Sequence, residues 1–279
     1  MPAWTNATAT IAGVLRKDEL ARHVDLRRSA CSPAVAPWVE NYWTLSWCMP
    51  DGVNFVSHVL PHPTCSLTVE RGHTRPEIGA EPVVVTGVMT SRFDADLRGW
   101  GWVLGVKFRP GGLAAYAGRS ARSWRDRVLG SGSVLPLELV ETMRSLDHRD
   151  PLERQVRTMD DALAAIRPDR TDPRYAHLLR IITDMLADRS LVSVAQVENR
   201  CGLPARALQR LFEHYVGVGP KWVLARYRMH DVIVELDAGY QASLTDLAHQ
   251  YGWYDQAHFN REFVATTGVT PGEYRASVS

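Results

Sequence analysis

Two stretches near the C-terminal end of the chain repeat one another, and they decide how this region folds. The first is Ser193-Val-Ala-Gln-Val-Glu-Asn-Arg-Cys-Gly202, followed by residues 203–212 and by Gly217-Val-Gly-Pro220. The second is Ser243-Leu-Thr-Asp-Leu-Ala-His-Gln-Tyr-Gly252, followed by residues 253–263 and by Gly268-Val-Thr-Pro271. The copies are offset by 50 residues in their first halves and by 51 in their second halves. The chain therefore carries one small helical unit twice.

Each copy has the local signals of two short helices joined by a tight turn. The serine at the start can cap the first helix, and the polar side chain three residues later can bond back to it. Apolar residues follow at spacings of three and four, as on one buried helix face. Gly202 and Gly252 suit the left-handed end of that helix. A plain helical hairpin would explain one copy, but two matching copies favour the helix-turn-helix motif that reads DNA.

A long helix is predicted between the copies, over residues 220–237. Pro220 suits a first helical turn, and Gly239 ends the helical pattern. At about 1.5 Å per residue this helix would be roughly 27 Å long. With the helix bodies added, the second helices of the two units would lie about 34 Å apart, which is one turn of DNA. We therefore expect residues 174–279 to fold alone and to contact two successive major grooves.

The duplicated region contains a recognisable signature. Its residues are Arg228-Met229, Leu247-Ala248, Tyr251-Gly252-Trp253, Phe259, Arg261, Phe263, Gly268, Thr270-Pro271 and Tyr274-Arg275. With them, the region resembles the DNA-binding domain of the AraC/XylS family of bacterial transcription regulators. Trp253 stands where that family usually has phenylalanine, and Val232 where alanine is common. The resemblance implies a seven-helix domain that binds double-stranded DNA and acts with RNA polymerase, as a monomer or a homodimer.

Carried over position by position, the resemblance assigns a DNA-reading face to each unit. These residues are Arg206, Gln209 and Arg210 in the first unit, and Gln256, Ala257, Asn260 and Arg261 in the second. Arginine can donate twice to guanine, glutamine or asparagine can pair with adenine, and alanine can touch only a thymine methyl group. A solvated helix face is the alternative for each polar residue. The helix starts at Ser193 and Ser243 could also meet phosphates, with Lys221 and Arg226 as weaker phosphate contacts.

The composition is that of an ordinary globular protein, and it limits the partners. The 279 residues suffice for two domains, and 45% of them are hydrophobic. The net charge is +1, and residues 174–279 hold eleven basic and eleven acidic side chains, which argues against strong nonspecific DNA binding. The chain shows no secretion signal and no apolar run of membrane-spanning length, so a cytoplasmic, nucleoid-associated protein without membrane contact is expected.

The N-terminal half has the pattern of a different domain. Short extended runs, separated by proline and glycine, are predicted at residues 39–48, 53–60, 65–70, 83–89, 92–97 and 102–108. They favour an antiparallel barrel or sandwich. Helices are predicted to end near residue 116 and to cover 136–146 and 150–166. The chain is thus expected to be α+β, with a β-rich effector-binding or dimerisation domain over 1–167, a linker over 168–173 and an all-α domain over 174–279.

Tryptophans are concentrated in this half. Trp43 and Trp47 share one strand face, and so do Trp100 and Trp102. We predict that these four residues line an aromatic pocket for an apolar or planar effector, with a solid aromatic core as the alternative. The stretches Gly105-Val-Lys-Phe-Arg-Pro-Gly-Gly112, Val85-Thr-Gly87 and Tyr42-Trp43 resemble the uncharacterised N-terminal domain of one branch of AraC-type regulators. That resemblance implies a sensor or a dimerisation module and names no ligand.

Some clusters point to other chemistry, but more weakly. His58, His62 and Cys65, with His73 nearby, could bind a metal, but His58 and His62 span Pro61 and no firm fourth ligand is present. We therefore predict no metal site and no cofactor.

Two arginines four residues apart, Arg71 and Arg75, could clamp a phosphate or a cyclic dinucleotide, although a solvated hairpin loop is the simpler interpretation.

The sequence assembles no catalytic site. It has no Gly-x-Ser-x-Gly elbow, no His-Glu-x-x-His motif and no phosphate-binding glycine loop before a helix. A DNA-repair type of enzyme would need a nucleophilic cysteine, Cys31 or Cys65, and neither has the spacing of zinc ligands. A protein-interaction module built from the same helices is a further alternative, against which the pattern of arginine and glutamine argues. We therefore expect a DNA-binding regulator and no enzyme.

Overall fold

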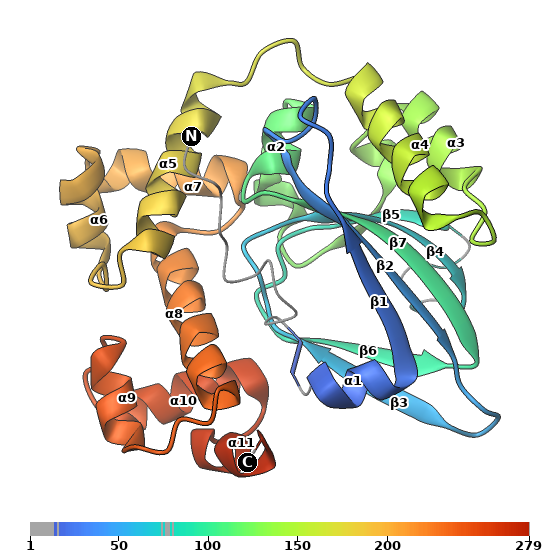
Figure 1. The fold of residues 1–279 in the computed structure, drawn as a ribbon. Coiled ribbons are helices and arrows are strands. Elements are labelled where there is room, and N and C mark those ends of the chain that lie inside the picture. Colours follow the sequence, from blue (N-terminus) through green and yellow to red (C-terminus); the bar gives the residue numbers. More distant parts are fainter. Residues whose placement is uncertain (1–13, 16, 74, 76–78, 80, 279) are drawn as a thin grey trace.

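The computed structural model describes residues 14–15, 17–73, 75, 79 and 81–278. A β-rich N-terminal part and a helical C-terminal part lie side by side (Figure 1). The segment between α4 (Leu152–Ala165) and α5 (Pro173–Ala187) joins them across the top of this view. The fold is therefore α+β, with the two kinds of structure separated along the chain as the sequence predicts.

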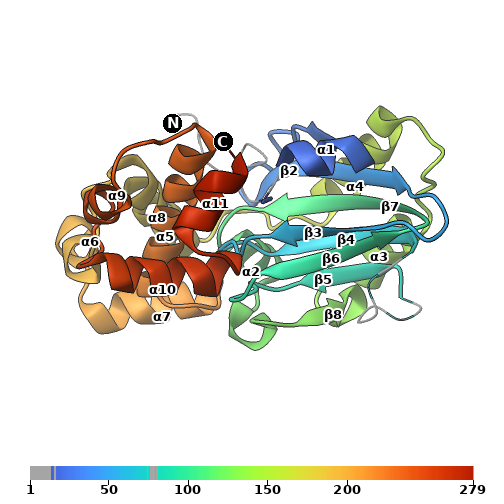
Figure 2. The same ribbon diagram turned by 90° about the horizontal axis from the view of Figure 1, so that it is seen from below.

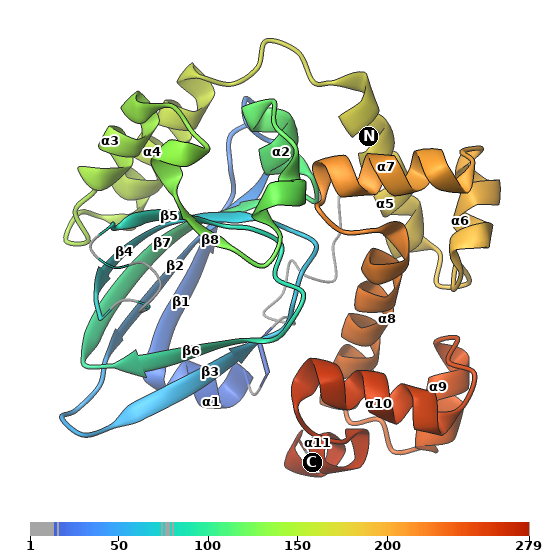
Figure 3. The same ribbon diagram turned by 180° about the vertical axis from the view of Figure 1, so that it is seen from behind.

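The N-terminal part is built on a six-stranded antiparallel sheet. In spatial order its strands are β1 (Val24–Ser29), β2 (Val39–Cys48), β7 (Trp100–Phe108), β4 (Ser66–Gly72), β5 (Val83–Thr86) and β8 (Val128–Gly130). A separate two-stranded ribbon, formed by β3 (Asn54–Val59) and β6 (Phe93–Arg98), faces one side of this sheet beside α1 (Lys17–His23) (Figures 1 and 3). We call this pair of strands the β3–β6 ribbon.

Helices cover the other side of the six-stranded sheet. They are α2 (Gly112–Ala117), α3 (Leu137–Arg144) and α4, with the short 3-10 helices η4 (Ala121–Trp124) and η5 (Ser131–Ser133) between them. In Figure 1, α3 and α4 lie above the sheet and the ribbon lies below it. Residues 101–106 of β7 are consequently buried without a break, because both faces of this central strand are covered.

Seven helices make up the C-terminal part, as the family resemblance implies. After α5 they are α6 (Val194–Cys201), α7 (Ala205–Tyr215), α8 (Pro220–Asp237), α9 (Leu244–Gln250), α10 (Gln256–Thr267) and α11 (Pro271–Val278). We call α6 with α7 the first unit, α9 with α10 the second unit, and α7 and α10 the recognition helices. Figure 3 shows the recognition helices at opposite ends of α8, and Figure 2 shows the same helices from below.

The local signals in the duplicated sequence are confirmed, except that the described residues show no return hydrogen bond from the Asp246 side chain to Ser243. Ser193 and Gln196 form a reciprocal capping box, in which each side chain accepts a hydrogen bond from the backbone of the other residue. The Ser243 hydroxyl accepts from the first turn of α9. Gly202 and Gly252 have φ angles of 68° and 78°, so each ends its helix in the left-handed region.

Every run that the sequence predicts as extended contains a strand, but two strands are not predicted. β1 is an edge strand that pairs only with β2, and its charged residues hide the alternation of a half-buried strand. β8 has only three residues. The run predicted to continue to residue 89 ends at Thr86, because Gly87 packs against η4: a Cβ there would lie 1.9 Å from the carbonyl oxygen of Trp124.

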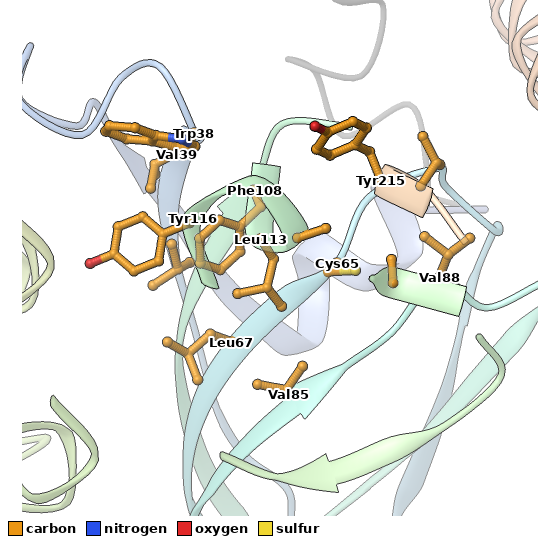
Figure 4. Packing of buried hydrophobic residues seen from close by; sticks show 14 of the residues in the cluster. Trp38, Val39, Cys65, Leu67, Val85, Val88, Phe108, Leu113, Tyr116 and Tyr215 are labelled. Atoms are coloured by element: carbon orange, nitrogen blue, oxygen red, sulfur yellow. The ribbon is translucent and has the colours of Figure 1, made fainter. Parts of the chain in front are cut away.

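A single apolar core joins the N-terminal part to the first unit. In Figure 4, Leu67 and Phe108 from the sheet meet Leu113 and Tyr116 from α2, and Tyr215 from α7 lies at the edge of the same cluster. The second unit has a separate core shared with α8. Its buried members include Met229, Val232, Ile233, Leu236, Leu247, Ala248, Phe259, Phe263 and Tyr274, joined by Leu15 and Leu60 of the N-terminal part.

Candidate nucleic-acid interface and the adjoining cavity

The side chains predicted to read DNA lie on the two recognition helices, and most of them face solvent. The exposed ones are Arg206, Gln209, Arg210, Gln256, Ala257 and Arg261. Arg210 and Arg261 each precede a buried phenylalanine, Phe212 or Phe263, by two residues. In the described part of the chain no carboxylate forms an ion pair with Arg206, Arg210 or Arg261. Their guanidinium groups are therefore accessible to phosphates or bases.

The two glutamines of this face are held by neighbouring side chains. Gln209 Nε2 donates to Glu213 Oε1 at 2.9 Å, and Gln256 Oε1 accepts from Thr245 Oγ1 at 2.8 Å. One hydrogen bond orients each amide, and each amide keeps further donor and acceptor capacity for a base edge.

Two side chains differ from the expectation of open, solvent-facing DNA contacts. Asn260 is only partly exposed, and its Oδ1 is buried with no hydrogen-bond partner among the described residues. The interpretation of Arg226 as a phosphate contact is wrong. Its guanidinium donates to Thr266 Oγ1 at 3.0 Å and lies 5.0 Å from the ring centroid of Trp222, while burial lowers its pKa to about 10. Arg226 thus fastens α8 to α10, whereas Lys221 is exposed at the start of α8.

A cavity of about 320 Å³ lies between the six-stranded sheet and the β3–β6 ribbon. Trp43 and Trp47 line it, together with apolar side chains such as Leu45, Phe93 and Val103. Its volume is within the range of small-molecule sites, which hold roughly 300–1,000 Å³.

Two glycines make room for the tryptophans of the cavity. Trp43 pairs with Gly105 across β2 and β7, and Trp47 pairs with Gly101. A Cβ at Gly105 would lie 2.2 Å from the Trp43 ring, and one at Gly101 would lie 2.1 Å from the Trp47 ring. The indoles therefore cover the glycines, and any side chain at these positions would displace the rings.

Trp100 and Trp102 do not line the cavity, so this half of the pocket prediction is wrong. They pair with Cys48 and Ser46, which puts them on the opposite face of the sheet from Trp43 and Trp47. Trp102 is buried in the main core, and Trp100 is 49% exposed with its ring 5.3 Å from that of His148. Spacing within one strand cannot reveal this, because the register between β2 and β7 decides which pairs share a face.

One end of the cavity carries a buried ion pair. Arg75 Nη2 donates to Glu70 Oε1 at 2.5 Å, and Thr68 Oγ1 donates to the same carboxylate at 2.8 Å. Arg75 also lies 5.3 Å from the ring centroid of Phe93. The proposed clamp of two arginines is therefore wrong, because Arg75 turns inward while Arg71 donates to a backbone carbonyl at the end of α3.

A second polar group lies elsewhere on the cavity wall. Lys107 donates to Glu40 at 2.9 Å, and burial lowers the pKa of Lys107 against the opposing effect of this carboxylate. Asn41 on β2 and Ser66 on β4 pair with Lys107 in register and also line the cavity. The cavity thus combines an aromatic and aliphatic lining with two separate polar groups.

The side chains considered as metal ligands have other partners. His58 Nδ1 lies 2.8 Å from Asp94 Oδ1. The His62 ring stacks on that of His230 from α8 with 4.1 Å between ring centroids. Cys65 is buried in the core, and burial raises the pKa of its thiol to about 12. Within the described residues, no three His, Cys, Asp or Glu side chains are arranged to hold a metal ion.

Comparison with known protein families divides the chain in the same way. Residues 197–277 match the family model of a helix-turn-helix domain, and residues 27–130 match a domain of unknown function, DUF6597. Two solved structures of ToxT from Vibrio cholerae each align with 85% of this chain and 98% of their own, at 12% and 13% identity and TM-scores of 0.44 and 0.40. The curated proteins include no match.

The chain therefore carries an AraC-type helix-turn-helix domain behind an N-terminal domain of unknown function. A domain of this type is the mark of a DNA-binding transcription regulator. Among the helices of the described part, none is both long and apolar enough to cross a membrane.

Proposed function

We propose that this regulator reads two half-sites of duplex DNA with its recognition helices and responds to a small molecule held in the cavity. The observation that carries the DNA-reading proposal is the matched exposure of Arg210 and Arg261 at equivalent positions of the two units. The 18 residues of α8 separate the units. At about 1.5 Å per residue this separation suits half-sites one helical turn apart.

The near-neutral charge of the C-terminal part supports reading of bases over general attraction to phosphates. Arg206 and Arg210 on α7, and Arg261 on α10, would donate to guanine or to phosphate. Gln209 and Gln256 would pair with adenine, Asn260 would contribute from the edge of the face, and Ala257 would meet a thymine methyl group.

The lining of the cavity supports an apolar ligand with a flat portion. Trp43 and Trp47 offer ring faces, while Arg75 with Glu70 and Lys107 would orient polar groups of the ligand. Such a site, mostly apolar with a few placed polar groups, is typical of small-molecule binding. The ligand would regulate transcription by binding one arrangement of the two domains better than another.

The domain boundaries expected from the sequence complete the proposal. The effector domain would span residues 1–167 and the DNA-binding domain 174–279, with RNA polymerase as the partner of the DNA-bound protein. Asp172, in the segment between them, caps α5 by accepting from the Arg174 amide.

The DNA-reading proposal is tested with Arg210→Ala and Arg261→Ala, on duplexes selected by the wild-type chain from a random pool. Each variant is expected to lose about 1–3 kcal/mol of specific binding and to relax the base preference in its own half-site. Arg157→Ala is the matched control, because Arg157 is exposed and belongs to α4. Figure 1 shows α4 in the N-terminal part. If both recognition-helix variants bind as tightly as the wild type, the assignment is wrong.

The cavity proposal is tested by tryptophan fluorescence during a screen of apolar metabolites. A bound ligand is expected to change the emission of the wild-type protein. Trp43→Phe should reduce this response, and Trp100→Phe should preserve it because Trp100 faces away from the cavity. A response that depends on Trp100 alone would place the ligand elsewhere.

A further inference from the structure

The last turn of the second recognition helix is contacted by a side chain of the N-terminal part. Arg92, the residue before β6, donates from Nη1 to the backbone oxygen of Thr267 at 2.5 Å. The helix ends at Gly268 with a φ of 84°, and a Cβ on that glycine would lie 2.2 Å from Arg92 Nη1. A cation at this position satisfies a terminal carbonyl and interacts favourably with the negative end of the helix dipole.

Arg92 is itself held in place from the ribbon. Its Nε and Nη2 donate to the two carboxylate oxygens of Asp94 at 2.7 and 2.8 Å. His58, the register partner of Asp94 on β3, bonds to the same carboxylate. The guanidinium therefore makes three hydrogen bonds, two to Asp94 on the ribbon and one to Thr267 on α10. Together they set the position of the end of α10 relative to the ribbon.

The ribbon that carries Arg92 is also a wall of the cavity. Ser91 and Phe93, on either side of Arg92, line the cavity. Leu60 and His62, which follow β3, line it as well and contact α8 on their other side. Among the described strands, those of the ribbon pair with each other and not with the six-stranded sheet, which holds the far end of β6 through a hydrogen bond from Trp47 Nε1 to the Arg98 carbonyl. The end of the ribbon next to Arg92 can therefore shift without breaking the strand pairs of the sheet.

We propose that Arg92 is a positioning residue for the second recognition helix, and that the β3–β6 ribbon makes the position of this helix depend on what fills the cavity. The proposal rests on the DNA-reading function proposed above. A bound molecule that displaces Phe93 would also displace Arg92. Through its bond to Thr267, Arg92 would then shift α10 and its DNA-reading side chains relative to α7. Loss of Arg92 would leave α10 folded but less firmly placed.

Hydrogen exchange of the full chain tests the contact without DNA. Arg92→Ala is expected to speed exchange of the amides at the end of α10 about tenfold, while those of α7 stay unchanged. Arg92→Lys, which keeps a cation for Thr267, should restore part of the protection. Arg98→Ala is the matched control, since Arg98 is an exposed arginine at the other end of β6. Unchanged exchange in α10 of Arg92→Ala would overturn the proposal.

DNA duplexes with altered spacing test the positioning role. The half-sites selected by the wild-type chain are moved apart or together by single base pairs. Arg92→Ala is expected to lose preference for the native spacing and to keep its base preference, whereas Arg261→Ala should lose affinity at every spacing. An unchanged spacing preference in Arg92→Ala would refute positioning. If the wild type selects no duplex at all, the DNA-reading proposal is refuted. The contact between Arg92 and α10 is still tested by the hydrogen-exchange experiment, which uses no DNA.

Filling the cavity tests the link between the cavity and α10. Ser57 is buried and lines the cavity from β3. Ser57→Phe, or Ala95→Leu if the first variant does not fold, should change exchange at the end of α10 at least severalfold. When the same substitution is combined with Arg92→Ala, exchange at the end of α10 should be no different from that of Arg92→Ala alone. If the cavity-filling substitution changes this exchange by the same factor in the presence and in the absence of Arg92, the cavity does not act through this residue.

Discussion

The two helix-turn-helix units come from nearly the same sequence pattern, but they are attached to the rest of the protein in different ways. The first unit, together with α5, shares the core of the N-terminal part: a Cβ on Gly111 would lie 2.8 Å from Tyr215 Cβ on α7 and 2.9 Å from Leu178 Cδ2 on α5. Tyr175 on α5 adds a hydrogen bond to the carbonyl of Pro37 at 3.0 Å. The second unit packs mainly on α8 and meets the N-terminal part through a few side chains, including Arg92.

Duplicated sequence therefore does not imply duplicated stability. The serine caps and the left-handed glycine turns recur in both units because they depend on residues close in the sequence. The attachments differ because they depend on what each unit meets in space. A rigidly held first unit and a more loosely held second unit would let a ligand change the distance between two DNA-reading helices.

The largest expected effect comes from separating the C-terminal part. A fragment of residues 174–279 exposes Tyr175, Leu178 and Tyr215, and each loses about 1.5–3 kcal/mol of burial. We expect α5 and α7 to exchange their amides rapidly in this fragment, while α9–α11 remain protected by their own core. The expectation that the fragment folds alone would then hold for the second unit only. Equal protection of both units would contradict the difference in attachment between the first and the second unit.

A smaller effect is expected from the glycines that end the two recognition helices. Gly217 and Gly268 have φ angles of 88° and 84°, so alanine costs roughly 1–2 kcal/mol of backbone strain at either position. A Cβ at Gly217 would also lie 2.9 Å from the backbone carbonyl oxygen of Ala121. At Gly268 a Cβ would meet the end of the Arg92 side chain, which can turn aside by giving up its hydrogen bond to Thr267. Gly217→Ala should therefore lower the free energy of unfolding more than Gly268→Ala in denaturant titrations. The reverse order would contradict the tighter attachment of the first unit.

The smallest effect concerns pH. Burial raises the pKa of Asp172, but hydrogen bonds from Tyr215 and from the Arg174 amide outweigh burial and hold the pKa below its ordinary value of 3.8. Because the folded pKa is lowered, this carboxylate stabilises the first unit above the ordinary range of aspartate, and the stabilisation is lost as the pH falls through the lowered pKa.

Thermal unfolding at a series of pH values measures this contribution. Wild type should be more stable than Asp172→Asn at neutral pH, and the two curves should converge in acid. Asp188→Asn is a suitable comparison, since Asp188 also has a lowered pKa and its carboxylate bonds to Ser190 and Arg200, both in the C-terminal part. A stability difference between wild type and Asp172→Asn that is independent of pH would show that the charge of Asp172 does not fasten the first unit.

Much of the DNA-binding part could be predicted from the sequence because its signals are local. Ser193, Gln196 and Gly202 define a helix with both ends, and the length of α8 follows from Pro220 and Gly239. Exposure of Arg210 and Arg261 follows from their place between buried residues at helical spacing. Arg226 was harder to place, because a long arginine at a helix surface can reach either solvent or the next helix.

Less of the N-terminal site could be predicted, because it depends on pairing between distant strands. The sequence shows which tryptophans share a strand face, but not which strands face the cavity. The glycines Gly101 and Gly105, spaced four apart like Trp47 and Trp43, are the signal that could have assigned the correct pair. Each glycine leaves room on the face that a large ring covers, whereas the residues of β2 that pair with Trp100 and Trp102 are Cys48 and Ser46.

The amino-acid sequence alone is enough to identify the duplication, the helix ends and the exposure of Arg210 and Arg261, since each depends on residues within a few turns of one another. Only the tertiary structure decided that Arg92 caps the second recognition helix, that Arg75 turns inward to Glu70, and that the first unit shares a core with the N-terminal part. These contacts join residues far apart in the chain, and their free energy depends on burial and geometry that exist only once the sheet, the ribbon and α8 have assembled.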